Sequence, residues 1–406
     1  MPHQTNVRSN SAEHINPPLP DSIPTLGSLF TANGYEAVHF GKTHDMGSLR
    51  GFRHKEPVAK PFTDPEFPVN NDSFLDVGTC EDAVAYLSNP PQEPFICIAD
   101  FQNPHNICGY VGENKGEHID SPISTPLPLL PENFEVEDWE KLPLPIQYIC
   151  CSHRRMMQAA HWNEGNYRHY VAAFQHYTRI VARQIESVLE ALYSTPAGKN
   201  TIVIVLADHG DGMGSHRMVT KQVSFYEEMT NVPFIIAGPG IHPRQKPVED
   251  LLTQPTIDLL PTLCELAGIP VPSSKPGISL APFLKGEKQK RQHPYAASEW
   301  HSEYEVTVSP GRMIRSPRYK YTHYLEGNGE ELYDMLKDKG ERRNLAHDPK
   351  YSKILAEHRA LLDDYIRRTQ DDYRSLKVEA DKRWRSHAPG YPNHEGPCAR
   401  DIINRK

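Results

Sequence analysis

The sequence predicts an α/β protein with a doubly wound, mainly parallel sheet, followed by a smaller antiparallel sheet with one helix. Unbroken apolar runs at 94–100, 201–207 and 231–237 are typical of strands buried on both faces of a parallel sheet. Helical patterns lie between these runs, as parallel connections require. After residue 290 the runs become short and are joined by turns, which is typical of an antiparallel sheet.

Composition excludes several classes of protein. The 406 residues carry a formal charge of -8, which argues against nucleic acid or an anionic membrane as the main partner. No apolar run approaches the roughly 20 residues of a membrane span. The seven cysteines are irregularly spaced and include no CxxC pair, so we expect neither a disulfide framework nor a zinc site. The first residues also lack the basic and apolar regions of a signal peptide.

The first helix and strand have clear boundaries. Residues 23–33 place apolar side chains on one helical face, with Thr25 as a plausible N-cap and Gly34 as the stop. The short strand 35–40 follows. A helix at 81–88 then leads into the apolar run at 94–100, so the pattern alternates as a doubly wound sheet requires.

The middle of the chain holds the strongest helix. Residues 167–193 repeat apolar side chains every three or four positions. Before it lies a proline-rich excursion, 111–150, which is too long for a plain connection and is expected to be a functional or covering loop. A further helix is predicted at 256–267, ending at Gly268.

The C-terminal part is predicted to be a small subdomain. An amphipathic helix at 354–366 is expected to pack on its sheet, and the tail after 381 is polar. We therefore divide the chain into an α/β domain at 1–290, an α+β subdomain at 291–380 and an extended tail at 381–406. The predicted short strands are 295–300, 312–315, 319–324 and 331–335.

Polar side chains follow three of the predicted parallel strands. Because the carboxyl ends of parallel strands share one edge of the sheet, these side chains can converge. They are Lys42 and His44 after the first strand, His105 after the second, Asp208 and His209 after the third, and Lys221 a short loop later.

These residue types support a limited range of chemistry. Asp208 and His209 offer an oxygen and an imidazole nitrogen to a divalent cation. The two lysines are compact cations suited to a tetrahedral oxyanion, and the other two histidines can orient a nucleophile or protonate a leaving oxygen. Taken singly, Lys42 is better explained as a solvated lysine, His105 is equally well explained as a turn histidine bonded to backbone, and His209 could cap the following turn. Together they favour transfer or hydrolysis of a sulfate or phosphate ester.

At this point the sequence resembles the sulfatases of the alkaline-phosphatase-like superfamily. Gly41-Lys42-Thr43-His44 is close to the G-K-W-H of that family, and the other matches follow in the family's order from residue 2 to about 349. They are Asn103-Pro104-His105, Asp208-His209-Gly210-Asp211, Lys221, Phe225-Tyr226-Glu227, residues 232–240, Ile314-Arg315 with Tyr319-Lys320-Tyr321, Glu331-Leu332-Tyr333-Asp334 and Asn344-Leu345.

The resemblance implies an alkaline-phosphatase-like fold and a role for each candidate. The implied roles are calcium binding by Asp208 and His209, sulfate binding by Lys42 and Lys221, orientation of the nucleophile by His44, and contact with the sulfate or leaving group by His105.

The sequence departs from the family at the nucleophile. That nucleophile is a formylglycine made from the Cys or Ser of a C/S-x-P-S/A-R motif, and neither the motif nor the accompanying Asp pair occurs in the expected place. The opening residues 1–7 resemble a phrase, Y-P-H-Q-T-G-V, that follows this motif in the family. We therefore expect the family's first strand and nucleophile to be missing here, and this chain to be nearly inactive and to bind calcium weakly. Residues 150–154, Cys-Cys-Ser-His-Arg, are no substitute, because Ser152 replaces the proline and the segment lies beyond two core strands.

The predicted function is hydrolysis of a sulfate ester, on a sulfated small molecule or glycan. The loop at 111–150 and the polar residues of the small subdomain are expected to shape a saccharide site. Two alternatives stay open: a phosphate or phosphonate ester hydrolase of the same superfamily, and a non-catalytic pseudoenzyme that binds sulfated glycans. The sequence predicts neither the oligomeric state nor the compartment, although sulfatases are often exported.

Overall fold

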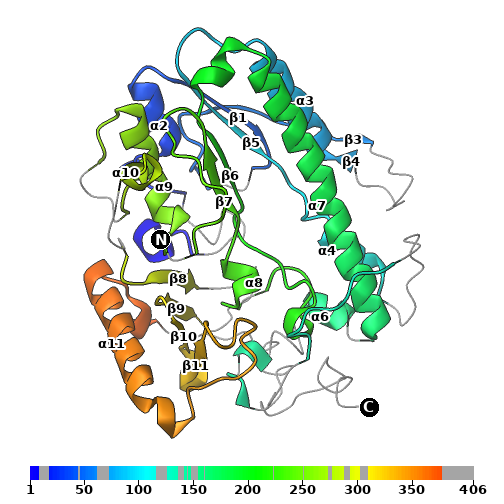
Figure 1. Cartoon of the computed structure of the whole chain (residues 1–406), viewed down its shortest axis with the longest axis vertical. Coiled ribbons are helices and arrows are strands. Elements are labelled where there is room, and N and C mark those ends of the chain that lie inside the picture. Colours follow the sequence, from blue (N-terminus) through cyan, green and yellow to red (C-terminus); the bar gives the residue numbers. More distant parts are fainter. Residues whose placement is uncertain are drawn as a thin grey trace.

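The computed structural model describes most of the chain (Figure 1). The tail predicted at 381–406 lies outside the described residues. The described ranges are 1–8, 18–43, 46–61, 73–115, 126–135, 141–143, 145–147, 154–159, 161–222, 224–249, 251–272, 277–287, 293–301 and 310–376.

A three-stranded parallel sheet lies at the centre of the first domain. Its strand order is β2 (Arg53–Lys55), β1 (Glu36–Gly41) and β5 (Phe95–Asp100). In the β1–β5 register Gly41 is opposite Asp100, so both strands end at the same edge. This edge is where the sequence predicted the polar side chains to gather.

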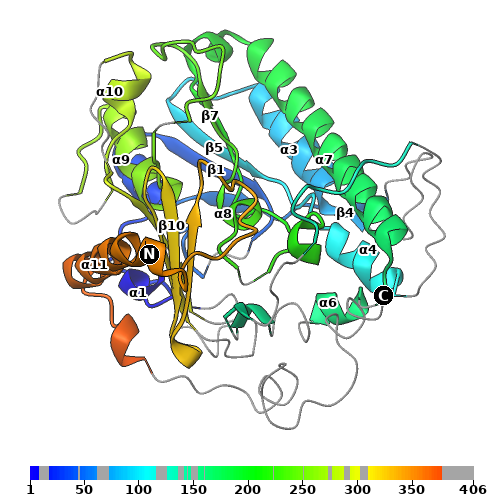
Figure 2. The same ribbon diagram turned by 60° about the horizontal axis from the view of Figure 1, so that its bottom comes forward.

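Helices cover both faces of this sheet. α3 (Leu75–Ser88) and α7 (Glu164–Tyr193) lie side by side on one face, and α2 (Leu26–Ala32) and α9 (Pro255–Ala267) lie on the other (Figures 1 and 2). The doubly wound arrangement is therefore confirmed. The core beneath α3 and α7 contains Val38, Phe40 and Ala83, and the core beneath α2 and α9 contains Phe30, Cys264 and Ile269.

Helix boundaries follow the sequence signals closely. The Thr25 side chain accepts the backbone N–H of Ser28 at 3.2 Å, which makes it the N-cap of α2. Gly34 and Gly268 have φ of 82° and 70°, the left-handed conformation that ends a helix. α3 begins at Leu75, six residues before the predicted start at Glu81.

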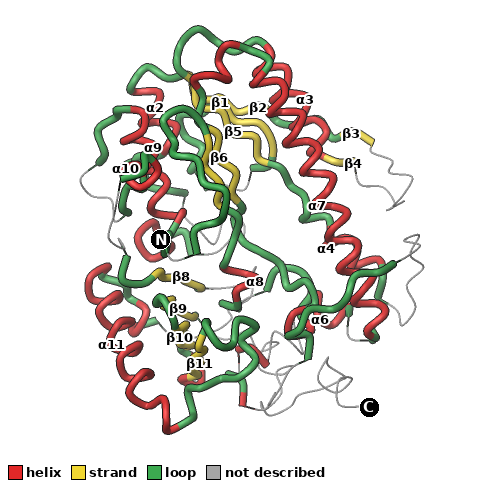
Figure 3. The backbone as a smooth tube through the Cα atoms, viewed as in Figure 1, coloured by secondary structure: helices red, strands yellow, loops and turns green. Residues whose placement is uncertain are grey.

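A second sheet pairs β6 (Val203–Leu206) with β7 (Phe234–Ala237) in antiparallel orientation. Figures 1 and 3 draw this pair beside β5, and Val203 packs against the same apolar cluster as β5. The prediction that the 201–207 run is buried on both faces is wrong, because Leu206 is 43% exposed. Among the described strands β6 pairs only with β7, and of its four residues Leu206 alone is exposed.

Short elements complete the first domain. The predicted excursion at 111–150 starts inside α4 (Ile107–Glu113). Phe134 within it is buried in the main apolar cluster, which also includes Tyr170 and Met313. The remaining short elements are α1 (Pro2–Thr5), β3 (Lys60–Pro61), β4 (Ser73–Phe74), α4 (Ile107–Glu113), α6 (Arg154–Gln158), α8 (Glu227–Thr230) and α10 (Ala281–Leu284).

The C-terminal subdomain is a four-stranded antiparallel sheet with one covering helix. The strands run in the order β11, β10, β9, β8, and α11 (Ser352–Thr369) packs on one face through an apolar cluster that includes Leu355 and Leu362. The opposite face packs against the first domain through the main apolar cluster. The predicted antiparallel sheet and helix are confirmed. The strands are β8 (Ala296–Trp300), β9 (Gly311–Arg315), β10 (Tyr319–Tyr324) and β11 (Gly329–Asp334).

The first eight residues lie against the C-terminal subdomain. The Arg8 guanidinium is 2.8 Å from the Asp372 carboxylate, and Met1 packs against the cluster beneath α11. The domain boundary near residue 290 remains a prediction, and these first residues contact the part beyond it. No helix in the described ranges is long and apolar enough to cross a membrane.

Candidate active site

The first candidate, Lys42, follows directly after β1. Its backbone N–H donates to the Asp100 carbonyl at 3.0 Å, which keeps the ends of β1 and β5 together. The approach requires Gly41, whose φ is 112° and where a Cβ would lie 2.1 Å from the Asp100 oxygen. His44, predicted to orient the nucleophile, lies outside the described residues.

His105 is carried by a rigid turn after β5. The carboxylate of Asp76, at the start of α3, accepts the N–H groups of Gln102 at 2.6 Å and Asn103 at 2.9 Å. Asp76 is 1% exposed, and burial raises its pKa. Sequence reasoning missed this residue, because an Asp in a first helical turn is ordinary and its link to a distant loop cannot be predicted from spacing.

Asp208 and His209 form a turn with donors of the type that bind metals. His209 Nδ1 is 2.8 Å from the Gly210 carbonyl, which can only accept, so Nδ1 is the donor of this hydrogen bond. Nε2 lies 3.5 Å from Asp208 Oδ2. A hydrogen bond from Nδ1 to a backbone carbonyl is the usual way in which a metal-binding histidine is oriented.

The structure brings these residues and Lys221 together. The pKa of His105 is lowered to about 4, first by burial and then by the positive charges of Lys221, Lys42 and His209, against a smaller opposing effect of Asp208. His105 is therefore within electrostatic range of the other four described candidates. Its imidazole is neutral at physiological pH, so one ring nitrogen can donate a hydrogen bond and the other can accept one.

The two lysines are neighbouring cations whose charges affect each other. Within the described ranges, neither the Lys42 nor the Lys221 amine forms a hydrogen bond or ion pair, although both side chains are partly buried. Burial lowers the pKa of Lys221 and Lys42 acts in the same direction, against opposing effects of Cys108, Asp208 and Asp211. A half-buried pair of cations without counterions favours the binding of an anion.

The donors fit a divalent cation in part. Asp208 and His209 supply one carboxylate and one imidazole, whereas calcium takes roughly six to eight oxygen ligands. The described residues at this edge therefore provide part of a coordination sphere. Residues 150–153 lie outside the described ranges.

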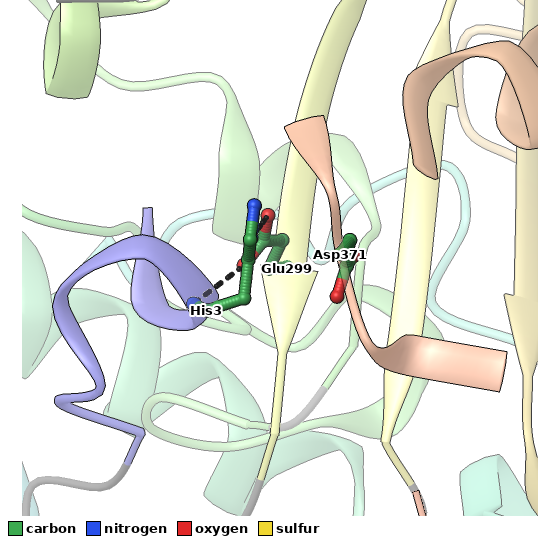
Figure 4. A group of neighbouring side chains, drawn as sticks. All are labelled: His3, Glu299 and Asp371. Atoms are coloured by element: carbon green, nitrogen blue, oxygen red, sulfur yellow. Dashed lines mark hydrogen bonds and ion pairs between the residues drawn. The ribbon is translucent and has the colours of Figure 1, made fainter. Parts of the chain in front are cut away.

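A group of three potential metal donors lies elsewhere, at the contact of the N-terminus with the C-terminal subdomain (Figure 4). It comprises His3, Glu299 and Asp371. His3 Nδ1 is 2.7 Å from Glu299 Oε1, and both Asp371 oxygens accept from Arg312, at 2.7 and 3.0 Å. The Asp371 charge is already neutralised by the buried Arg312 guanidinium. We therefore interpret the group as a contact that holds the N-terminal residues against the C-terminal subdomain.

Comparisons with known proteins find similarity to sulfatases. The sulfatase family model matches residues 1–269, and the model for the C-terminal part of N-sulphoglucosamine sulphohydrolase matches residues 214–368. A Delta 4,5-hexuronate-2-O-sulfatase of Bacteroides thetaiotaomicron is 78% identical over 406 residues, covering 100% of this chain and 84% of that protein. A choline-sulfatase of Rhizobium meliloti is 26% identical, covering 86% of this chain and 71% of that protein.

Solved structures show the same fold. The structure of a 2-O GAG sulfatase superimposes with a TM-score of 0.93 at 78% identity, covering 99% of this chain and 86% of that one. A phosphonate monoester hydrolase of Agrobacterium radiobacter superimposes with a TM-score of 0.69 at 18% identity, covering 90% of this chain and 84% of that one. The second match concerns the fold alone.

Proposed function

The chain belongs to the sulfatase family of sulfate ester hydrolases, and from this premise we propose that it acts on the 2-O-sulfate of a Δ4,5-unsaturated hexuronate derived from a glycosaminoglycan. The observation that carries the proposal is the pair of uncompensated lysines beside a neutral imidazole at the strand ends. The identity of 78% over the whole chain to a relative named for this ester supports the choice of substrate.

Each described residue has a role in this proposal. Lys42 and Lys221 hold the sulfate oxygens, where partial burial strengthens the attraction between opposite charges. His105, kept neutral by its surroundings, contacts the sulfate or the leaving oxygen. A hexuronate adds a carboxylate to the sulfate, and this second negative charge also favours a site with excess positive charge.

Three further candidates concern the metal and the nucleophile. We propose that Asp208 and His209 bind calcium, which when bound would supply positive charge to the sulfate oxygens. His44 is proposed to orient the nucleophile.

The test compares binding of three ligands to the full chain by titration calorimetry. They are an unsaturated disaccharide sulfated at the hexuronate 2-O position, the same disaccharide without sulfate, and an isomer sulfated only on the neighbouring amino sugar. The proposal expects the 2-O-sulfated ligand to bind at least about ten-fold more tightly than either alternative, since one charge-assisted hydrogen bond contributes roughly 1.5–3 kcal/mol. Equal affinity for all three would contradict it.

A matched pair of variants assigns the binding to the site. Lys42→Met is expected to remove the preference for the sulfated ligand. Lys199→Met is the control, because Lys199 is exposed and precedes β6 at the opposite end of the strand from Asp208. Sulfate release is measured in parallel. A phosphate monoester turned over faster than the sulfate ester would favour the phosphatase alternative.

A further inference from the structure

Lys221 follows a loop whose backbone is strained. In residues 213–220, four side-chain-bearing residues adopt the left-handed conformation, which is unfavourable for such residues and most of all for a β-branched threonine. Such a loop persists only where surrounding contacts hold it. The four are Met213 (φ 48°), His216 (φ 51°), Arg217 (φ 55°) and Thr220 (φ 58°).

One buried pair of side chains holds both ends of this loop. The Tyr170 hydroxyl, from the second turn of α7, accepts the N–H of Thr220 at 2.7 Å and donates to Asp211 Oδ1. The same Oδ1 accepts the N–H of Met213 at 3.0 Å. Tyr170 is fully buried and Asp211 is 8% exposed, so water does not compete for these bonds. The backbone closes in parallel, with the N–H of Gly212 donating to the Thr220 carbonyl at 3.0 Å.

The pair joins the two halves of the candidate site. Asp211 comes two residues after His209, and Thr220 directly precedes Lys221. We infer that Tyr170 and Asp211 are positioning residues that place the Lys221 amine at the anion site by fixing the loop between them. The inference rests on the proposed function, which assigns Lys221 to sulfate binding. Both residues act through the backbone and touch no substrate.

A purely structural role for Tyr170 is the alternative that the experiment must separate. The chain offers a matched control in Tyr365, another largely buried phenol that donates to a carboxylate, Glu299 Oε1, at 2.5 Å. Tyr365 lies on α11 in the C-terminal subdomain and has no link to the loop. Tyr→Phe at either position removes one buried hydroxyl and its hydrogen bond to a carboxylate.

The experiment measures the affinity of the full chain for inorganic sulfate by titration calorimetry, together with urea unfolding of each variant. Tyr170→Phe is expected to weaken sulfate binding about ten-fold, whereas Tyr365→Phe changes only the stability. The double variant Tyr170→Phe, Lys221→Met should bind sulfate no more weakly than Lys221→Met alone, because Tyr170 acts through that lysine.

A second test compares two substitutions of Asp211, one of which keeps its hydrogen bonds. Asp211→Asn retains an oxygen able to accept from both Tyr170 and Met213, so it should keep most of the sulfate affinity that Asp211→Ala loses. Equal losses in the two variants would show that the charge of Asp211, and not its hydrogen bonds, matters, and would overturn the inference.

Other outcomes separate the inference from its premise. Additive losses in the double variant, or equal weakening by Tyr170→Phe and Tyr365→Phe, would overturn the positioning role. So would unchanged sulfate affinity in a folded Tyr170→Phe variant. Failure of the unsubstituted chain to bind sulfate would instead overturn the proposed function together with the inference.

Discussion

Lys320 and Lys221 are both shielded from water, but they differ in whether the protein supplies a counterion for the amine. The Lys320 amine, in the C-terminal sheet, lies 2.7 Å from Glu227 Oε1, 2.9 Å from Glu341 Oε1 and 2.7 Å from the Phe225 carbonyl. Lys320 is 1% exposed. The partly buried Lys221 amine has no such partner among the described residues. A lysine whose charge is neutralised within the protein holds the structure together, and one without a counterion is available to a ligand.

The same contrast extends to neighbouring groups. In the C-terminal subdomain Arg312 donates to both oxygens of Asp371, and Glu331 accepts from the phenols of Tyr226 and Tyr333, at 3.1 and 2.8 Å. At the strand ends the His105 ring has no side-chain partner among the described residues, and it lies near two cations that lower its pKa. The charges of the C-terminal subdomain are paired without a ligand, whereas the strand ends are stabilised when they bind one.

The largest effect on stability is expected from removing the Lys320 amine from its carboxylate partners. Lys320→Met leaves the buried Glu341 carboxylate without its cation and should lower the free energy of unfolding by about 3–5 kcal/mol. Urea unfolding followed by circular dichroism measures this. Adding Glu341→Leu to Lys320→Met should recover part of the loss, because one of the uncompensated charges is then removed. A loss below about 1 kcal/mol for Lys320→Met would contradict the contrast.

The corresponding change at the strand ends should act on binding and not on stability. Lys221→Met is expected to weaken sulfate binding by about 10- to 100-fold, the range of one charge-assisted hydrogen bond. Its free energy of unfolding should stay within about 0.5 kcal/mol or rise, since a partly desolvated cation beside Lys42 is removed. Destabilisation as large as that of Lys320→Met would mean that Lys221 is structural.

The pH dependence of stability provides a smaller effect. His105 has a pKa of about 4 in the folded protein against 6.5 for an unperturbed histidine, so between these values the unfolded chain binds more protons. The free energy of unfolding should therefore fall as pH drops from 6.5 towards 4. Bound sulfate should raise this pKa and reduce the fall, as should His105→Gln. Thermal unfolding across this range with and without sulfate measures both, and an acid sensitivity independent of sulfate would exclude His105 from the site.

The smallest effect is expected from an exposed ion pair that belongs to neither cluster. Arg343 lies 3.1 Å from Asp348, with a side chain 71% exposed. Arg343→Ala should change the free energy of unfolding by less than about 1 kcal/mol and leave sulfate affinity unchanged. The same unfolding and titration experiments serve, and a larger change in either quantity would show that exposure is a poor guide to the role of a charge here.

Much of the fold follows from local patterns. The apolar runs located β1, β5, β6 and β7, and the 3.6-residue period located α7 and α11, because these signals reflect which face each element buries. The exposure of Leu206 could not be predicted, since it depends on which strands flank β6. Likewise the antiparallel direction of β7 is set by the path of the chain and not by its composition.

The site divides in the same way. Lys42 and His105 could be expected to lie together, because the parallel strands β1 and β5 end at one edge. The nearness of Asp208, His209 and Lys221 depends on where the separate β6–β7 pair lies, which strand patterns do not predict. Asp76 and Tyr170 could not be predicted either, because each acts through a hydrogen bond to backbone 26 or 50 residues away in the chain. The role of Lys320 was also hidden: its motif resembled the family, but its two carboxylate partners come from separate segments.

The most direct measurement is a crystal structure of the full chain soaked in selenate, a tetrahedral oxyanion whose selenium is located by anomalous scattering. The account predicts a selenium peak at the strand ends, with selenate oxygens at roughly 2.7–3.2 Å from the amines of both Lys42 and Lys221. A peak at Lys320 or elsewhere, with the two strand-end lysines free of anion, would contradict it.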